Sequence, residues 1–129
     1  SLITILGSVF ATGSANIIVP SQKTSLIATE LYQVLDTSDV PSGYINILTA
    51  KENELNSTLS LHENIDGIWF FGKKLSEKSN IIKNTTSNLK RFWCPEEQEI
   101  DWFSNEKLFL EEFLHQSTQI KNIWIPYGE

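Results

Sequence analysis

Residues 15–49 decide the fold and read ANIIVPSQKTSLIATELYQVLDTSDVPSGYINILT. The β-branched run Ile17–Val19, closed by Pro20, is typical of a strand buried in a parallel sheet. Apolar residues then recur at helical spacing and predict an amphipathic helix; they are Leu26, Ile27, Leu31, Val34 and Leu35. After turn-forming residues at 38–43, Tyr44–Leu48 reads as a second strand. Strand, helix and strand form a βαβ unit, which favours an α/β fold with a parallel sheet.

Local chemistry predicts where the first two helices begin and end. Residues 2–11 are apolar nearly all round, which predicts a buried helix. We expect this helix to end near Gly13, because glycine readily adopts the left-handed conformation of a helix C-cap. Thr24 is the predicted N-cap of the next helix, because its hydroxyl can accept a hydrogen bond from an amide of the first turn.

The rest of the chain continues to alternate between helix and strand. Leu55 and Leu59 share one face of a short predicted helix, and residues 105–115 have the pattern of a strong amphipathic helix. The other predicted elements are strands at 66–71, 88–94 and 119–125 and a helix at 74–83. The chain thus reads as successive strand–helix units, then an acidic stretch (PEEQEID, 95–101), then a separate helix and strand.

Composition excludes several classes of protein. With 129 residues and 40% hydrophobic content, the chain is globular and about the size of one domain. Its formal net charge of −6 argues against binding to nucleic acid or to an anionic membrane surface. No stretch approaches the roughly 18 apolar residues of a membrane span. A single cysteine rules out an internal disulfide and suits a reducing compartment, so we expect a cytoplasmic protein.

The sequence resembles the aldehyde dehydrogenase family over residues 2–94 and again over residues 113–129. Residues 13–26 and 40–50 read GSANIIVPSQKTSL and VPSGYINILTA, where the family's cofactor-binding domain has GN-VV-KPSE-TPL and LP-GV-N-V-TG. Residues 117–129, STQIKNIWIPYGE, resemble the family's C-terminus, most closely that of long two-module members whose second module is a degenerate repeat of the first. In that family a further strand precedes residue 2, so the resemblance implies a fragment of a longer polypeptide.

Pattern and resemblance together predict an α/β fold. We expect an incomplete, mostly parallel Rossmann-like sheet with flanking helices, followed by a C-terminal helix and an oligomerisation strand. Within one compact unit, we assign residues 1–94 to a degenerate cofactor-domain-like region, 95–104 to an acidic linker and 105–129 to the C-terminal helix and strand. The linker stands where the family has its catalytic domain, which implies that this chain lacks that domain.

The resemblance implies that the NAD site is vestigial. The family's KPSE falls on Val19–Gln22, so Val19 and Gln22 replace the lysine and glutamate that hold the adenosine ribose, while Ser21 is kept. The family's FTGS falls on 70–73, so Gly72 is kept and Lys73 replaces a pyrophosphate-binding serine. We therefore predict no cofactor, and NAD only if these vestigial positions still form a site.

The loop after the second strand argues in the same direction. A dinucleotide site needs glycines there, because the pyrophosphate must approach the backbone at a helix N-terminus. Residues 50–56 read AKENELN, with no glycine and two glutamates. Side chains would crowd a phosphate, and the two carboxylates would repel it. This loop distinguishes a cofactor-binding enzyme, which should keep its glycines, from a module that has lost its cofactor.

No residue has the setting of a catalytic or metal-binding group. Cys94 is the only thiol, and the family's catalytic cysteine lies in the domain that this chain lacks. The family's NLKRVTLELGG, which carries its general-base glutamate, aligns with NLKRFWCPEEQE, so Pro95 takes the glutamate position and Glu96 is one residue away. We predict a structural role for Cys94. His62 and His115 belong to no cluster with metal-ligand spacing, so we expect no metal.

Aromatic and β-branched residues gather in the second half of the chain. Trp93, Trp102, Phe103 and Trp124 could pack in the core or act as interface anchors, and the sequence leaves both open. The terminal strand carries the predicted interface residues, which are Ile120, Ile123, Trp124 and Ile125. In the resembling family this strand belongs to an oligomerisation arm, and an unpaired strand can indeed add to another sheet edge.

Three functions follow from these observations. The first is a non-catalytic, aldehyde-dehydrogenase-like assembly module that self-associates or supports a partner aldehyde dehydrogenase module, without nucleic acid or membrane. The alternative is part of an active NAD(P)-dependent aldehyde dehydrogenase, completed by other segments or by a partner chain. A third is a free-standing binding module that uses exposed aromatic residues.

Overall fold

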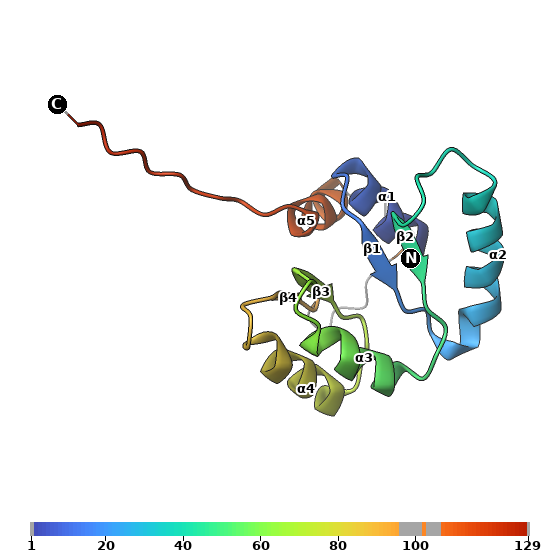
Figure 1. The fold of residues 1–129 in the computed structure, drawn as a ribbon. Coiled ribbons are helices and arrows are strands. Elements are labelled where there is room, and N and C mark those ends of the chain that lie inside the picture. Colours follow the sequence, from blue (N-terminus) through green and yellow to red (C-terminus); the bar gives the residue numbers. More distant parts are fainter. Residues whose placement is uncertain (1, 96–101, 103–106, 129) are drawn as a thin grey trace. The chain divides into compact units, whose positions relative to one another are not determined.

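The chain forms two compact units, which are described here separately. A computed structural model describes residues 2–95, 102 and 107–128 (Figure 1). The first unit, which we call the terminal unit, combines Ser1–Ser14 with Asp101–Glu129. The second, which we call the sheet unit, is Ala15–Ile100. The boundaries expected around the linker 95–104 remain predictions, because most of the linker, Phe103 included, lies outside the described residues.

The sheet unit alternates strands and helices, which confirms the α/β fold class. In chain order its elements are β1 (Asn16–Ile18), a 3₁₀ turn (Gln22–Thr24), α2 (Ser25–Asp36), β2 (Ile45–Ile47), α3 (Glu52–Leu61), β3 (Gly67–Trp69), α4 (Leu75–Thr85) and β4 (Arg91–Trp93). Every strand and helix predicted between residues 15 and 94 is therefore present. The strands are shorter than expected, with three residues each.

The strands pair in parallel, as the βαβ pattern predicts, but they form two sheets. β1 pairs with β2, with Ile17 opposite Asn46. β3 pairs with β4, with Ile68 opposite Phe92. The two sheets contain two strands each, and the described residues form no ladder between them. Figure 1 shows the strands in the order β2, β1, β3, β4 across the view.

Helix α2 corrects two predictions. Thr24 is the N-cap residue, but its hydroxyl donates to the carbonyl oxygen of Ser21 (3.2 Å) and accepts nothing from the first turn. The predicted apolar stripe is only half correct: Leu31 and Leu35 are half-buried, whereas Leu26, Ile27 and Val34 are exposed. The residue that α2 buries is Ala28, whose small side chain allows α2 to approach its neighbours closely.

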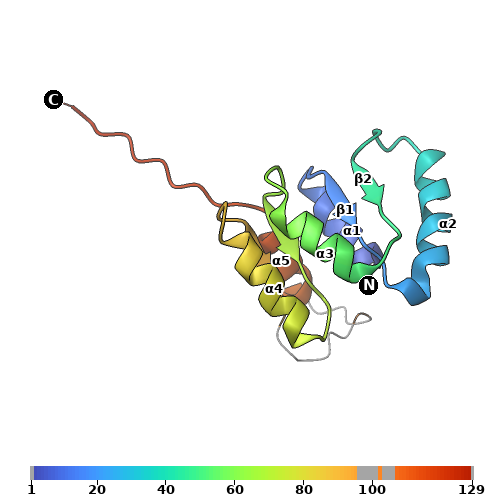
Figure 2. The ribbon, with the colours of Figure 1, turned by 60° about the horizontal axis from the view of Figure 1, so that its bottom comes forward.

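Helices α3 and α4 pack side by side, as Figures 1 and 2 both show. Their contact includes Ser60, which is fully buried, and Ile81, which is 3% exposed. The Ser60 hydroxyl donates to the carbonyl oxygen of Ser57 (2.9 Å) and accepts from Asn84 Nδ2 (2.8 Å). The buried hydroxyl is therefore satisfied, which offsets the cost of removing it from water.

The terminal unit is built on the contact between α1 (Leu2–Ala11) and α5 (Lys107–Ser117). Helix α1 ends as predicted: Gly13 has a φ of 70°, and Ser14 N donates to Val9 O (3.2 Å), which is a Schellman C-cap. Leu6 and Phe113 are buried, and Trp102 lies 6.0 Å from Phe113 between ring centroids. Ile3 is exposed, so α1 is not buried all round as expected.

The prediction of a C-terminal strand at 119–125 is wrong for a single copy of the chain. Residues 119–128 form neither helix nor strand, and the tail leaves α5 as an extended trace (Figures 1 and 2). A strand exists only where another strand satisfies its backbone groups, and the described residues provide none for this segment. Ile120, Ile123, Trp124 and Ile125 are therefore between 75% and 91% exposed.

A pair of glycine substitutions tests the backbone geometry. Gly43 has a φ of 82° in the turn closed by Tyr44 N and Pro41 O (3.2 Å), and no atom lies within 4 Å of an added Cβ. Gly43→Ala should therefore destabilise the fold through strain alone, by about 1 kcal/mol in urea unfolding. Gly7→Ala, in the interior of α1, should instead be stabilising by roughly 0.5–1 kcal/mol. Equal effects of the two substitutions would contradict the assigned turn.

Candidate functional site

The positions predicted to be vestigial lie at the carboxyl ends of strands in the sheet unit. Val19 directly follows β1, and the loop 48–51 follows β2, so parallel pairing brings both to the same edge of one sheet. Gly72 and Lys73 follow β3 in the other sheet and lead into α4. Ligands of open parallel sheets bind at carboxyl edges of this kind. The predicted positions therefore all follow strand carboxyl ends, but they divide between two separate sheets, and their role stays a prediction.

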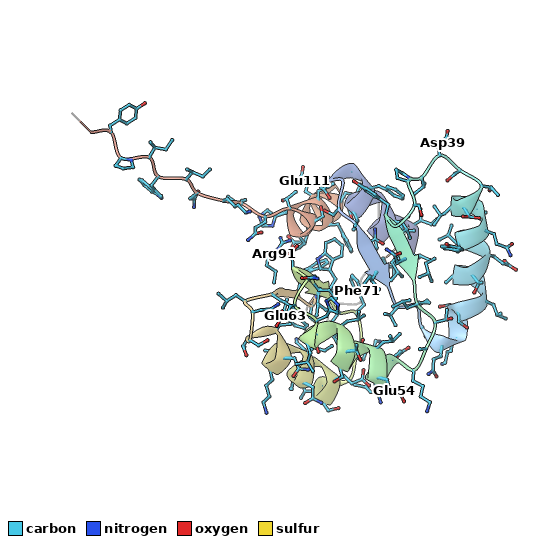
Figure 3. All side chains as sticks on the ribbon, viewed as in Figure 1. Asp39, Glu54, Glu63, Phe71, Arg91 and Glu111 are labelled. Carbon is cyan, nitrogen blue, oxygen red and sulfur yellow. The ribbon has the colours of Figure 1, made fainter. Side chains whose placement is uncertain are left out.

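The N-terminus of α3 carries the strongest electrostatic signal at this edge. Lys51 is the N-cap and makes no side-chain capping bond; its carbonyl oxygen accepts from the amides of Glu54 (3.1 Å) and Leu55 (3.2 Å). Glu52 and Glu54 occupy the first turn, and Figure 3 labels Glu54 there. Carboxylates at this end stabilise the helix dipole. The positive end of α3 is thus complemented by two negative side chains, of which Glu54 also pairs with the Lys51 ammonium (3.6 Å).

The segment after β1 offers little to an adenosine ribose. Val19 is half-buried and has no polar side-chain atom. Ser21 and Gln22 are exposed, and their carbonyl oxygens accept hydrogen bonds within the 3₁₀ turn, Ser21 O from Thr24 N (2.9 Å) and Gln22 O from Ser25 Oγ (3.2 Å). These backbone groups hold the turn together, and only the side chains of Ser21 and Gln22 face solvent.

The loop between β3 and α4 has a packing role that the sequence did not reveal. A Cβ added to Gly72 would overlap Cζ of Phe70, which is only 8% exposed. Glycine is needed here because the Phe70 ring occupies the space of a side chain. Lys73 is exposed, and the next residue, Lys74, is held by Glu77 at 2.9 Å. The hydrogen bond and the charge of Glu77 raise the pKa of Lys74.

A polar groove of about 520 Å³ runs between α3 and α4. The sequence patterns described above did not predict this groove. Its lining is formed largely by amides and hydroxyls, which are Asn53, Asn56, Ser57 and Ser60 from α3 and Ser76, Asn80 and Asn84 from α4, with Lys74, Glu77, Ile81 and Lys83. The polar residues of α3 recur at positions i, i+3, i+4 and i+7, which is the spacing of one helical face. That polar stripe is the signal that could have revealed the groove.

Cys94 lies directly after β4, and its structural role stays a prediction. It is half-buried, and its Sγ lies 3.8 Å from the carbonyl oxygen of Pro95, a weak hydrogen bond. The nearby cation Lys90 is buried and donates from Nζ to Asn88 Oδ1 (2.8 Å). Among residues 2–95, 102 and 107–128, no group of three His, Cys, Asp or Glu side chains could hold a metal ion.

The aromatic residues fall into different environments. Trp69 and Trp93 are register partners in β3 and β4 and pack edge to face with centroids 5.1 Å apart, and Phe71 lies 5.8 Å from Trp93. Trp102 packs on Phe113 in the terminal unit. Trp124, in contrast, is 91% exposed. Trp93 and Trp102 therefore pack within their units, as the core interpretation predicts, whereas an interface role for Trp124 stays a prediction.

The sheet unit is thus a parallel α/β unit, and comparison with known proteins identifies the family of the chain. The family model "Aldehyde dehydrogenase family" matches residues 3–94. The NADP/NAD-dependent aldehyde dehydrogenase PuuC of Escherichia coli (strain K12) is 34% identical over 88 residues, which cover 68% of this chain and 18% of that protein. The chain belongs to the aldehyde dehydrogenase family, as the sequence motifs indicate.

The match to this relative covers only part of its length. The chain spans 18% of the length of this curated relative, so the activity of a whole aldehyde dehydrogenase is a matter for proposal. No solved structure matches the chain.

Within the part of the chain that the structure describes, no helix combines the length and the apolar character needed to cross a membrane.

Gly72→Ala tests the packing of the loop before α4. The added methyl group would overlap the buried Phe70 ring, so we expect a loss of about 1–3 kcal/mol in the free energy of unfolding, as for other overpacked cores. Gly67→Ala is the matched control in β3, because its Cβ would meet no atom closer than 3.6 Å. Urea unfolding of both variants measures the difference. A neutral Gly72→Ala would show that the ring does not restrict this loop.

Proposed function

We propose that this chain is a non-catalytic module of the aldehyde dehydrogenase family whose role is structural assembly. One observation carries the proposal. The helix N-terminus at the carboxyl edge of the sheet, α3, has Glu52 and Glu54 in its first turn and no glycine in the loop before it. A pyrophosphate would need that loop for close backbone contact and that helix end for its charge.

The size of the electrostatic term supports this proposal. Two unit charges about 6 Å apart repel by roughly 0.7 kcal/mol in water and roughly 3 kcal/mol at the effective dielectric of a protein surface. Two carboxylates facing a pyrophosphate therefore oppose binding by several such terms. Val19 adds no donor to offset them, whereas Lys51, which lies 3.6 Å from Glu54, and the exposed Lys73 and Lys74 offset part of this repulsion. The surroundings of Cys94 support the same view, because the thiol is half-buried and its sulfur bonds weakly to Pro95.

The exposed tail supports the assembly part of the proposal. Burying a large apolar side chain is worth about 1.5–3 kcal/mol, and the tail holds four of them in water: Ile120, Ile123, Trp124 and Ile125. An extended segment of this composition gains both apolar contact and backbone hydrogen bonds by joining a sheet edge. We propose a second copy of the chain or a partner aldehyde dehydrogenase module as its partner, in a reducing, cytoplasmic setting.

A second candidate is part of an active NAD(P)-dependent aldehyde dehydrogenase. The 34% identity to the Escherichia coli protein, whose name states NADP/NAD dependence, favours it. In that case other segments or a partner chain would supply the catalytic groups. The cofactor affinity of the chain and the response of that affinity to Lys73 distinguish the two candidates.

Calorimetric titration with NAD⁺ and NADH at millimolar ligand tests the loss of the cofactor site. We expect no saturable heat, because the carboxylates of α3 and the missing glycines disfavour the pyrophosphate. Lys73→Ala should leave this result unchanged. Saturable binding in the micromolar range that Lys73→Ala abolishes would support the active-enzyme candidate and contradict the proposed function.

Removal of the tail tests the assembly role. Deletion of residues 119–129 should lower the mass of the chain in light scattering from that of an oligomer to that of one copy, because the apolar tail residues would be gone. Lys121→Ala, which removes the tail's only lysine and none of its apolar residues, is the control and should keep the oligomer. An unchanged mass after the deletion would contradict an assembly role for the tail.

A further inference from the structure

The groove between α3 and α4 has a defined shape within the sheet unit. The two helices lie side by side and run in the same direction (Figures 1 and 2). At their N-terminal ends the charge of Glu52 acts on Lys74, and at their C-terminal ends Asn84 donates to Ser60. Ser60 and the buried Ile81 form the floor of the groove. Its volume of about 520 Å³ lies within the roughly 300–1,000 Å³ range of small-molecule sites.

Most of the polar side chains that line this groove are not used by the fold. Among the described residues, none hydrogen-bonds to the side chains of five lining residues, which are Asn53, Asn56, Ser57, Ser76 and Asn80. Asn56 is half-buried, although its amide has no described partner in the protein. A primary amide donates two hydrogen bonds and accepts at its oxygen, and a hydroxyl also donates and accepts. The groove therefore offers a ligand donors and acceptors from both helices.

The charges of the groove favour a neutral ligand. Among the described lining residues only three carry a charge, and two of them, Lys74 and Glu77, form an ion pair at 2.9 Å. The third, Lys83, is exposed and has no described partner. An anion would meet this one unpaired cation together with the carboxylates of Glu52 and Glu77. A neutral ligand meets no such opposition, because its binding depends on hydrogen bonds alone.

Apolar surface is scarce in the lining of the groove. The described lining residues include no aromatic side chain, and Ile81 is the one aliphatic side chain among them. A planar aromatic ring is bound mainly through stacking and apolar contacts, which these residues do not offer. A ligand rich in hydroxyl groups fits this lining better, because each hydroxyl can donate to an amide oxygen and accept from an amide N–H.

We propose that the groove between α3 and α4 binds a neutral, polyhydroxylated small molecule, a sugar or a polyol, through the side-chain amides of Asn53, Asn56 and Asn80. Asn53 and Asn56 are three residues apart and therefore share one face of α3, while Asn80 lines the groove from α4. Packed helices hold such groups more precisely than loops do. This binding activity goes beyond the proposed assembly function and does not depend on it.

Nuclear magnetic resonance titration of the full-length chain tests the site. Glucose and maltose are added at rising millimolar concentrations while the side-chain amide signals of Asn53, Asn56 and Asn80 are followed. We expect saturable shifts of these three signals, because their amides would exchange water for the hydroxyl groups of the sugar. Trimethylamine N-oxide at the same concentrations is the control for general co-solute effects, since it is excluded from protein surfaces and carries no hydroxyl group. It should leave the three signals in place.

Substitutions on the two helices identify the groove as the site. Asn56→Ala and Asn80→Ala should each raise the dissociation constant for maltose by at least about threefold, and the double variant by at least about tenfold, because each removes an amide that bonds to the ligand. Asn64→Ala, which removes an exposed amide outside the groove, is the matched control and should leave the constant unchanged. Circular dichroism checks that every variant is folded.

Three results would overturn this inference. The first is the absence of any shift of the groove amides with either sugar. The second is sugar binding that the double variant retains at full strength. The third is binding of AMP or inorganic phosphate to the same amides at lower concentrations than either sugar, which would assign the groove to an anion. None of these results alters the light-scattering mass expected after removal of residues 119–129, so the assembly function is tested separately.

Discussion

Parallel pairing of very short strands is the constraint on which the rest of the sheet unit depends. A pair of three-residue strands makes only a few interstrand hydrogen bonds, and parallel strands need cover on their faces. Packing of the helices supplies the remaining stability: Ala28 fits α2 closely against its neighbours, and α3 and α4 share a contact that contains Ser60 and Ile81.

Local packing and charge explain which residues lie at the carboxyl ends of the strands. In a dinucleotide-binding sheet, glycines keep the loops thin so that a phosphate can reach the backbone. Here Gly72 is retained because the Phe70 ring fills its side-chain space. The helix end at Glu52 and Glu54 is stabilised by its own carboxylates. Residues that would serve a cofactor in one protein of this family can thus remain for packing reasons in another.

Sequence patterns predicted the elements and the family, because these depend on local periodicity and motif. The Schellman end at Gly13 and the turn at Gly43 followed from glycine chemistry alone. The face of α2 could not be predicted, because burial of Ala28 depends on which surface the helix meets. The groove between α3 and α4, the Phe70–Gly72 contact and the absence of a strand at 119–125 also depend on partners that are distant in sequence or missing.

The hydrogen bond from Asn84 to Ser60 has a consequence for covalent modification. Asn84-Thr85-Thr86 matches the acceptor sequence for N-linked glycans. In the folded chain the Asn84 amide nitrogen donates to the fully buried Ser60 hydroxyl, while Thr86, the hydroxyl residue of the acceptor sequence, is exposed. A sugar on Asn84 would take the place of this hydrogen bond and leave the buried Ser60 hydroxyl without its donor. Glycosylation at Asn84 would therefore weaken the contact between α3 and α4.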